Sequence, residues 1–206
     1  MQEANVKRWA RESHVSAAML ESVRGLNHRF LDLIGAAPRA WNSCGFARLP
    51  PDVQLRIAPL TPAQKKSAAN CPYALFDLKF HDDSHWRTRL HPDSSWNVAD
   101  APPLDDTRVD FARMALFFAW HVASVDKLAA RLLLGMNDVT VAAFRALTID
   151  CLAGLAATEA AHLSARWSDC PTYWSALTRA ATRSNSAQLR RAQLQGLQLT
   201  AAAHLG

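Results

Sequence analysis

His81 and His85 are the first residues whose types and spacing could do chemistry. Two histidines four residues apart share one face of a helix, and imidazole is a common zinc ligand. His91 and Asp93 follow closely and could supply a third ligand. The pattern departs from the HExxH zinc motif, because Asp82 stands where that motif has its glutamate. We expect Asp82 or its neighbour to cap a helix instead, and we predict no metal and no other cofactor.

No other motif in the sequence indicates catalysis. GxSxG, GxGxxG and GxxxxGK[ST] are all missing. The adjacent acids Asp82–Asp83 and Asp105–Asp106 stand where helices are expected to begin, and favourable charge at a helix start explains them. We therefore expect that the protein is not an enzyme.

The carboxyl-terminal segment is basic throughout. Between Cys170 and Gly206 the sequence contains four arginines and no Asp or Glu. Arg179 and Arg183 are four residues apart and share a helix face. A solvated helix face is one interpretation; contact with DNA phosphates is the other, because guanidinium donates paired hydrogen bonds to phosphate. The residues predicted to contact DNA are Arg145, Arg166, Arg179, Arg183, Arg190 and Arg191.

The composition permits nucleic-acid binding without requiring it. The chain has 206 residues and a formal net charge of +5, and half of its residues are hydrophobic. Neither a signal peptide nor an apolar stretch long enough to span a membrane is evident, so we expect no membrane association and a cytoplasmic location. The four cysteines form no CxxC pair, and we expect reduced thiols at Cys44, Cys71, Cys151 and Cys170.

Apolar spacing and helix caps predict an all-α multi-helix bundle with a long central helix and a helix-turn-helix-like unit. The expected helices cover 4–36, 61–71, 73–80, 82–90, 107–134, 138–146, 148–158, 171–182 and 185–205. The segment 91–107, which is rich in proline, aspartate and serine, is the best linker. We accordingly predict an N-terminal helical region over 1–103 and a C-terminal helical domain over 104–206.

The predicted central helix, 107–134, is apolar on nearly all sides. A seam of alternating three- and four-residue spacing suits packing against another long helix. We predict that this seam forms a dimer interface made by Phe111, Met114, Phe118, His121, Val125, Leu128 and Leu132. Leu116, Phe117 and Trp120 lie on the opposite side, so full burial of the helix is the alternative.

Residues 107–180 resemble the FlhD family of flagellar transcriptional activators. The similarity consists of a long apolar helix, the run from Asp126 to Asn137, a short helix, and Ala146-Leu147-Thr148 leading into Leu152. This resemblance implies a dimeric, all-helical transcription regulator that contacts DNA with the help of a partner subunit. Residues 1–103 have no counterpart in that family, and the second helix, 148–159, carries no Lys or Arg to read bases.

Two functions from different classes therefore remain. The first, which we favour, is a DNA-associated transcriptional regulator that acts as a helical dimer or with a partner subunit. The second is a helical interaction or adaptor protein that binds another protein without touching DNA. A metal protein or enzyme built on the segment from His81 to His91 is a distant third.

Overall fold

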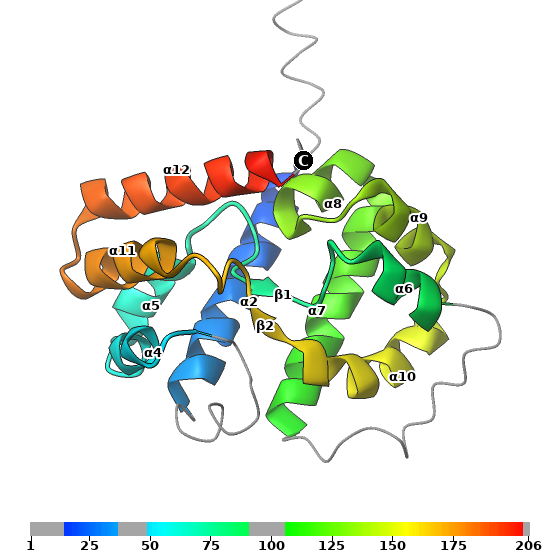
Figure 1. The fold of residues 1–206 in the computed structure, drawn as a ribbon, viewed down its shortest axis with the longest axis horizontal. Coiled ribbons are helices and arrows are strands. Elements are labelled where there is room, and N and C mark those ends of the chain that lie inside the picture. Colours follow the sequence, from blue (N-terminus) through cyan, green and yellow to red (C-terminus); the bar gives the residue numbers. More distant parts are fainter. Residues whose placement is uncertain (1–14, 37–48, 91–105, 204–206) are drawn as a thin grey trace, which may run out of the picture.

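The computed structural model describes residues 15–36, 49–90 and 106–203, and over these ranges the fold is all-helical apart from one two-stranded sheet (Figure 1). None of the described helices is both long and apolar enough to cross a bilayer. The helices are α2 (Ala17–Ala36), α4 (Pro51–Ile57), α5 (Pro62–Ala69), α6 (Asp83–Arg89), α7 (Asp106–Val125), α8 (Lys127–Leu134), α9 (Asp138–Ala146), α10 (Ile149–Glu159), the 3-10 turn η2 (Ala160–His162), α11 (Pro171–Thr182) and α12 (Ser186–Ala202). The strands are β1 (Phe76–Asp77) and β2 (Ser164–Ala165).

Several helices begin where the sequence places a capping side chain. Thr61 and Gln64 form a reciprocal capping box at the start of α5, with Pro62 in the first turn. Asp82 accepts a hydrogen bond from the His85 N–H at 3.0 Å and starts α6, as its position in the sequence predicts. Gly135 ends α8 in the left-handed conformation, with φ of 75°.

The predicted helix over 107–134 is two helices in the structure. Asp126 leaves helical geometry, and its carboxylate accepts a hydrogen bond from the Ala129 N–H at 2.8 Å. This cap ends α7 at Val125 and begins α8 at Lys127. The prediction of one continuous helix was wrong because an aspartate that could cap a new helix was treated as an interior residue.

Residues 73–80 were predicted to form a buried helix, and this prediction was also wrong. The segment consists of bends and a turn around the short strand β1, which pairs antiparallel with β2 and places Phe76 opposite Ala165. The fully buried side chain of Asn27 donates to the Tyr73 carbonyl oxygen at 2.8 Å and accepts from the Leu75 N–H at 2.7 Å. These bonds satisfy backbone groups that a helix would have satisfied internally.

α7 and α2 pack together in the middle of the molecule (Figure 1). α4, α5, α11 and α12 lie on one side of this pair, and α6, α8, α9 and α10 lie on the other. One hydrophobic cluster runs through the described residues, and at its centre the rings of Phe30, Phe76 and Phe111 contact one another. The boundary predicted near residue 104 lies outside the described residues, and the segments on its two sides share this core.

The buried face of α7 differs from the predicted seam. Its buried residues include the small alanines at 112, 115, 119 and 123 together with Leu116, and α7 contacts both α2 and α10. Phe111 is only 2% exposed and packs edge-on against Phe76, so it belongs to the core and not to a dimer interface. The rest of the predicted seam lies on the half-buried or exposed side of α7 and α8.

Candidate nucleic-acid interface and a buried histidine–glutamate cluster

Four of the arginines predicted to contact DNA lie around the turn that joins α11 to α12. The turn is tight: the N–H groups of Ser184 and Asn185 bond to carbonyls of the last turn of α11, and Asn185 then caps α12. The two helices consequently lie side by side (Figure 1). Arg179 and Arg183 extend from the end of α11, and Arg190 and Arg191 from the first turns of α12.

All four of these side chains are exposed. Over the part of the chain that the structure describes, none of the four forms an ion pair with a carboxylate. Neighbouring α5 is held against this hairpin at both ends, by Gln64 donating to the Thr182 carbonyl and Gln193 donating to the Asn70 carbonyl. α5 adds the exposed Lys66. We call Arg179, Arg183, Arg190 and Arg191 the hairpin arginines.

The other two predicted DNA contacts lie elsewhere. Arg145 is exposed on α9, which lies across the molecule from the α11–α12 turn (Figure 1). Arg166 is 7% exposed and donates to the Leu133 carbonyl at 3.2 Å, beside Gly135. Burial lowers the pKa of Arg166 to about 10. Arg166 therefore holds β2 against the end of α8, and the prediction of a surface phosphate contact fails for this residue.

A second constellation was not predicted as a group: His85, Glu159 and His162. Their potential ligand atoms all lie within 4.8 Å of one another. His85 Nε2 is 2.7 Å from Glu159 Oε2, and the His85 and His162 rings contact edge to face with centroids 4.9 Å apart. The Asp82 cap orients His85 on α6, and α10 and η2 position the other two side chains. We call these three residues the histidine–glutamate cluster.

The electrostatics of the cluster centre on a carboxylate removed from water. The Glu159 side chain is 0% exposed, and Arg89 Nε lies 2.9 Å from its Oε1 as an ion pair. That oxygen accepts no hydrogen bond of acceptable geometry within the described residues. Burial lowers the pKa of His162. The nearby Glu159 raises this pKa, and the cationic groups of Lys79, His85 and Arg89 lower it further. A neutral imidazole beside a buried carboxylate is suited to accept a cation.

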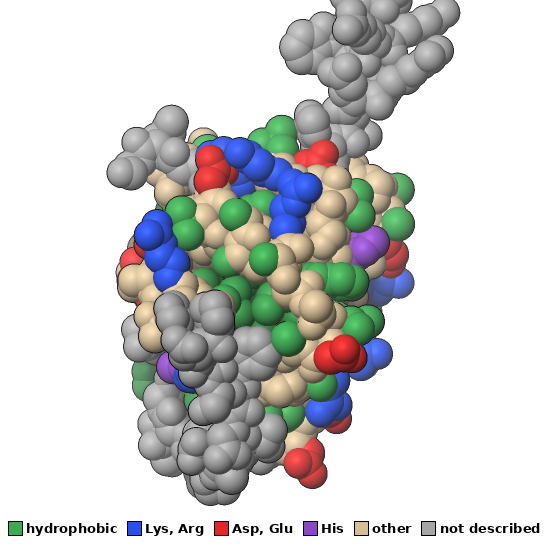
Figure 2. Space-filling view, turned by 90° about the vertical axis from the view of Figure 1, so that its right-hand side faces the viewer, with side chains coloured by type: hydrophobic (Ala, Val, Ile, Leu, Met, Phe, Trp, Pro, Cys, Tyr) green, Lys and Arg blue, Asp and Glu red, His purple; other side chains and the backbone are tan. Residues whose placement is uncertain are grey.

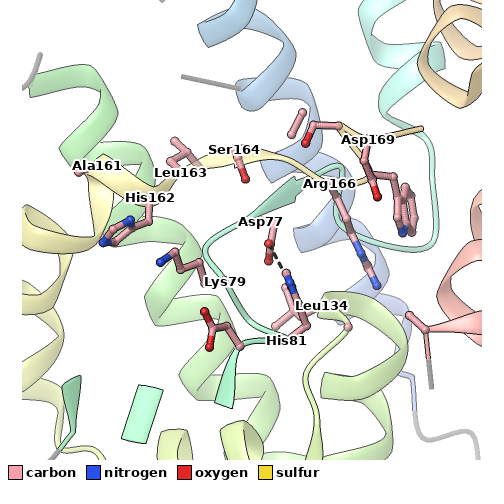
Figure 3. A pocket seen from close by; sticks show the side chains of 16 residues that line it. Asp77, Lys79, His81, Leu134, Ala161, His162, Leu163, Ser164, Arg166 and Asp169 are labelled. Atoms are coloured by element: carbon pink, nitrogen blue, oxygen red, sulfur yellow. Dashed lines mark ion pairs between the residues drawn. The ribbon is translucent and has the colours of Figure 1, made fainter. Parts of the chain in front are cut away.

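His162 also lines a cleft of about 880 Å³ between the two strand ends, η2 and the end of α8. Figure 3 shows Asp77 and His81 facing each other within this cleft, with Lys79 and His162 to one side and Arg166 to the other. The His81 Nδ1 and Asp77 Oδ2 atoms are 3.4 Å apart. The cleft thus holds charges of both signs within a small volume.

Two residues that line the cleft have unusual backbone conformations. Lys79, which follows β1, has φ of 57°, and Trp167, which follows β2, has φ of 53°. Non-glycine residues rarely adopt this left-handed region, and such strain concentrates at functional sites. Hydrogen bonds hold both loops: Trp86 Nε1 donates to the Lys79 carbonyl, and Trp174 Nε1 donates to the Arg166 carbonyl.

The sequence identified only one member of the cluster. His85 was considered with His81, but His81 turns to Asp77 and is outside the cluster, while His91 and Asp93 lie outside the described residues. Glu159 and His162 were missed. A usable signal exists: Glu159-Ala-Ala-His162 places an acid at the end of a largely apolar helix three residues before a histidine, a spacing found in carboxylate–histidine metal sites.

The remaining residues of the predicted dimer seam form a partly exposed apolar stripe. Met114 and Phe118 are half-buried, His121 is exposed, and Val125 is 61% exposed at the end of α7. Leu128 and Leu132 are exposed on α8, beyond the helix break at Asp126. Figure 2 shows hydrophobic side chains interspersed with other side chains on the face seen from the right of Figure 1, with Lys and Arg at the top and along both sides of the view.

In comparisons with protein-family models, with curated proteins and with solved structures, no match to this chain was found.

Proposed function

We propose that this protein is a DNA-associated transcriptional regulator that contacts the nucleic-acid backbone through the hairpin arginines. The observation that carries the proposal is the placement of four exposed arginines on the two helix ends that flank one turn, with no described carboxylate paired to them. Charges already neutralised within a protein gain little from a phosphate, whereas unpaired arginines release counterions from DNA when they bind it.

The binding mode is contact with phosphates and not base reading by α10. The exposed positions of α10 include Ile149, Asp150 and Ala153, which offer no cation to a phosphate. The buried side of the same helix packs on α7 through Leu152 and Leu155. Sequence specificity would then come from a partner subunit, as the FlhD resemblance implies.

Fluorescence anisotropy with a generic DNA duplex over a series of salt concentrations tests this proposal. Four phosphate contacts give a slope of log K against log salt of about −3.6. The double variant Arg190→Ala/Arg191→Ala should reduce the slope to about −1.8, because each lost contact removes about 0.9. Absence of binding at low salt would refute the proposal.

A charge-matched control distinguishes the hairpin arginines from general basicity. Arg87 and Arg113 are exposed, but each pairs with a carboxylate on its own helix, Asp83 and Asp110. The double variant Arg87→Ala/Arg113→Ala removes the same number of arginines and should leave the slope near that of the wild type. Equal losses in the two double variants would contradict a localised interface.

A helical adaptor without DNA binding is the second candidate, and the apolar stripe along α7 and α8 favours it. Both functions are compatible with a dimer formed through this stripe. Light scattering at tens of micromolar measures the oligomeric state of the full chain, and a monomer would refute the dimer. Leu128→Glu combined with Leu132→Glu should then shift a dimer to a monomer, because buried unpaired carboxylates are costly at an interface.

A further inference from the structure

We propose that the histidine–glutamate cluster binds one divalent transition-metal ion, with His85, Glu159 and His162 as its protein ligands. Neither the regulator nor the adaptor function depends on this site, and the proposal stands independently of both. Two imidazoles and one carboxylate form a ligand set used for zinc and for non-haem iron.

The positions of the three candidate ligand atoms suit a metal ion. The three candidate ligand atoms come from α6, α10 and η2, and they already converge within 4.8 Å of one another. Metal–nitrogen and metal–oxygen bonds of about 2.0–2.2 Å place ligand atoms about 3–4 Å apart around a tetrahedral ion. Small side-chain movements are therefore enough to enclose an ion.

The buried carboxylate of Glu159 also favours a bound cation. A carboxylate as fully buried as Glu159 needs positive charge and complete hydrogen bonding to offset its desolvation. Oε2 has the imidazole of His85 at 2.7 Å, but Oε1 has only an ion-pair contact from Arg89 without hydrogen-bond geometry. A metal ion bound by Nε2 and Oε2 would take the place of the hydrogen bond between these two atoms. Arg89 stays beside Oε1 and orients the carboxylate from outside the metal site.

The cleft gives a metal ion access to the cluster. His162 is the member of the cluster that also lines the cleft, and it forms no ion pair within the described residues. An ion can therefore reach the cluster from the cleft past this side chain. Three protein ligands leave a fourth position for water or a small ligand from the cleft.

The test uses the untagged full chain, stripped of metal with a chelator and dialysed against Zn²⁺, followed by elemental analysis. We expect about one zinc per chain, and Co²⁺ loading should give the visible absorption bands of a four-coordinate site. His162→Asn should weaken binding at least tenfold, because it removes one of the three ligands while keeping a similar side-chain volume. Binding by His162→Asn equal to that of the wild type would overturn the proposal.

Two further variants keep the test decisive. His81→Asn removes a second imidazole from the same cleft and should leave the stoichiometry and the Co²⁺ spectrum unchanged, since His81 pairs with Asp77 outside the cluster. Glu159→Gln removes the charge and should also lose the ion; its thermal unfolding reports whether it still folds. Zinc content near zero in the loaded wild type, or loss of the ion in His81→Asn alone, would assign no metal to the cluster.

Discussion

The side-chain amide of Asn27 donates a hydrogen bond to the backbone carbonyl of Tyr73 over 2.8 Å, although the two residues are 46 positions apart. The same amide reaches the Ala69 carbonyl at 3.3 Å, and its oxygen accepts from the Leu75 N–H at 2.7 Å. One side chain of α2 thereby holds the end of α5 and the segment leading into β1. Because β1 begins the cleft, Asn27 indirectly positions the cleft as well.

Asn27→Ala should destabilise the protein by about 2 kcal/mol or more, because the Tyr73 carbonyl and the Leu75 N–H lose their partner at about 1–3 kcal/mol each, while the Ala69 carbonyl keeps the Cys71 N–H. Urea unfolding followed by circular dichroism measures this change. Asn70→Ala, at an exposed site, is the control and should change the free energy of unfolding by less than about 0.5 kcal/mol. Similar values for the two variants would show that the Asn27 bonds are not important for stability.

Gly196→Ala should destabilise the protein even though alanine favours a helix by about 1 kcal/mol. A Cβ at this position of α12 would overlap the hydroxyl of Tyr73, which is fixed by the Gln193 carbonyl and by Tyr173. We expect a net loss of about 1–3 kcal/mol in thermal or urea unfolding.

Gly25→Ala is the matched control for Gly196→Ala. Gly25 is exposed within α2, and a Cβ there would have no atom within 4 Å. The substitution should stabilise the protein by about 1 kcal/mol through helix propensity alone. Stabilisation by both variants would mean that α12 does not pack against Tyr73 as described.

Cys71 should resist thiol reagents in the folded protein. It is fully buried, and this burial raises the pKa of its thiol to about 12, so almost no thiolate forms at pH 8. Peptide mapping after iodoacetamide treatment should show labelling of the partly exposed Cys151 and Cys170 before that of Cys71. In urea the differences should disappear, and rapid labelling of Cys71 without denaturant would contradict its burial.

His81 should titrate at a higher pH than an unperturbed histidine. A hydrogen bond to Asp77 raises the pKa of its imidazole above 6.5, against a smaller opposing effect of burial. The pairing therefore contributes stability below pH 6.5 and loses it as the pH rises through the folded-state pKa. Two-dimensional NMR of the imidazole groups measures the value, and Asp77→Asn should lower it; an unchanged value would exclude the pairing.

Local signals in the sequence predicted most of the helices. Thr61, Asp82 and Gly135 act within one turn of their own position, so caps and helix ends could be recognised without knowledge of the fold. The same local reasoning missed Asp126 as a cap and turned α7 and α8 into one helix. It also chose the wrong face of α7, because large apolar residues were given more weight than the alanines that allow close helix packing.

The candidate sites also differ in how far local sequence could predict them. Four exposed arginines on consecutive helices could be recognised from sequence, since an acid-free segment stays basic wherever it folds. Arg166 could not, because its burial against Leu133 depends on a strand that pairs across the molecule.

The sequence by itself therefore determined an all-helical chain with a basic carboxyl-terminal segment, because periodicity, capping and charge are properties of neighbouring residues. Only the tertiary structure decided which side of α7 is buried, why residues 73–80 are not helical, and that His85 meets Glu159 and His162. The physical reason is that the partners of buried polar groups are set by proximity in space and not by proximity in sequence. His85 and Glu159, for example, are 74 residues apart in the sequence.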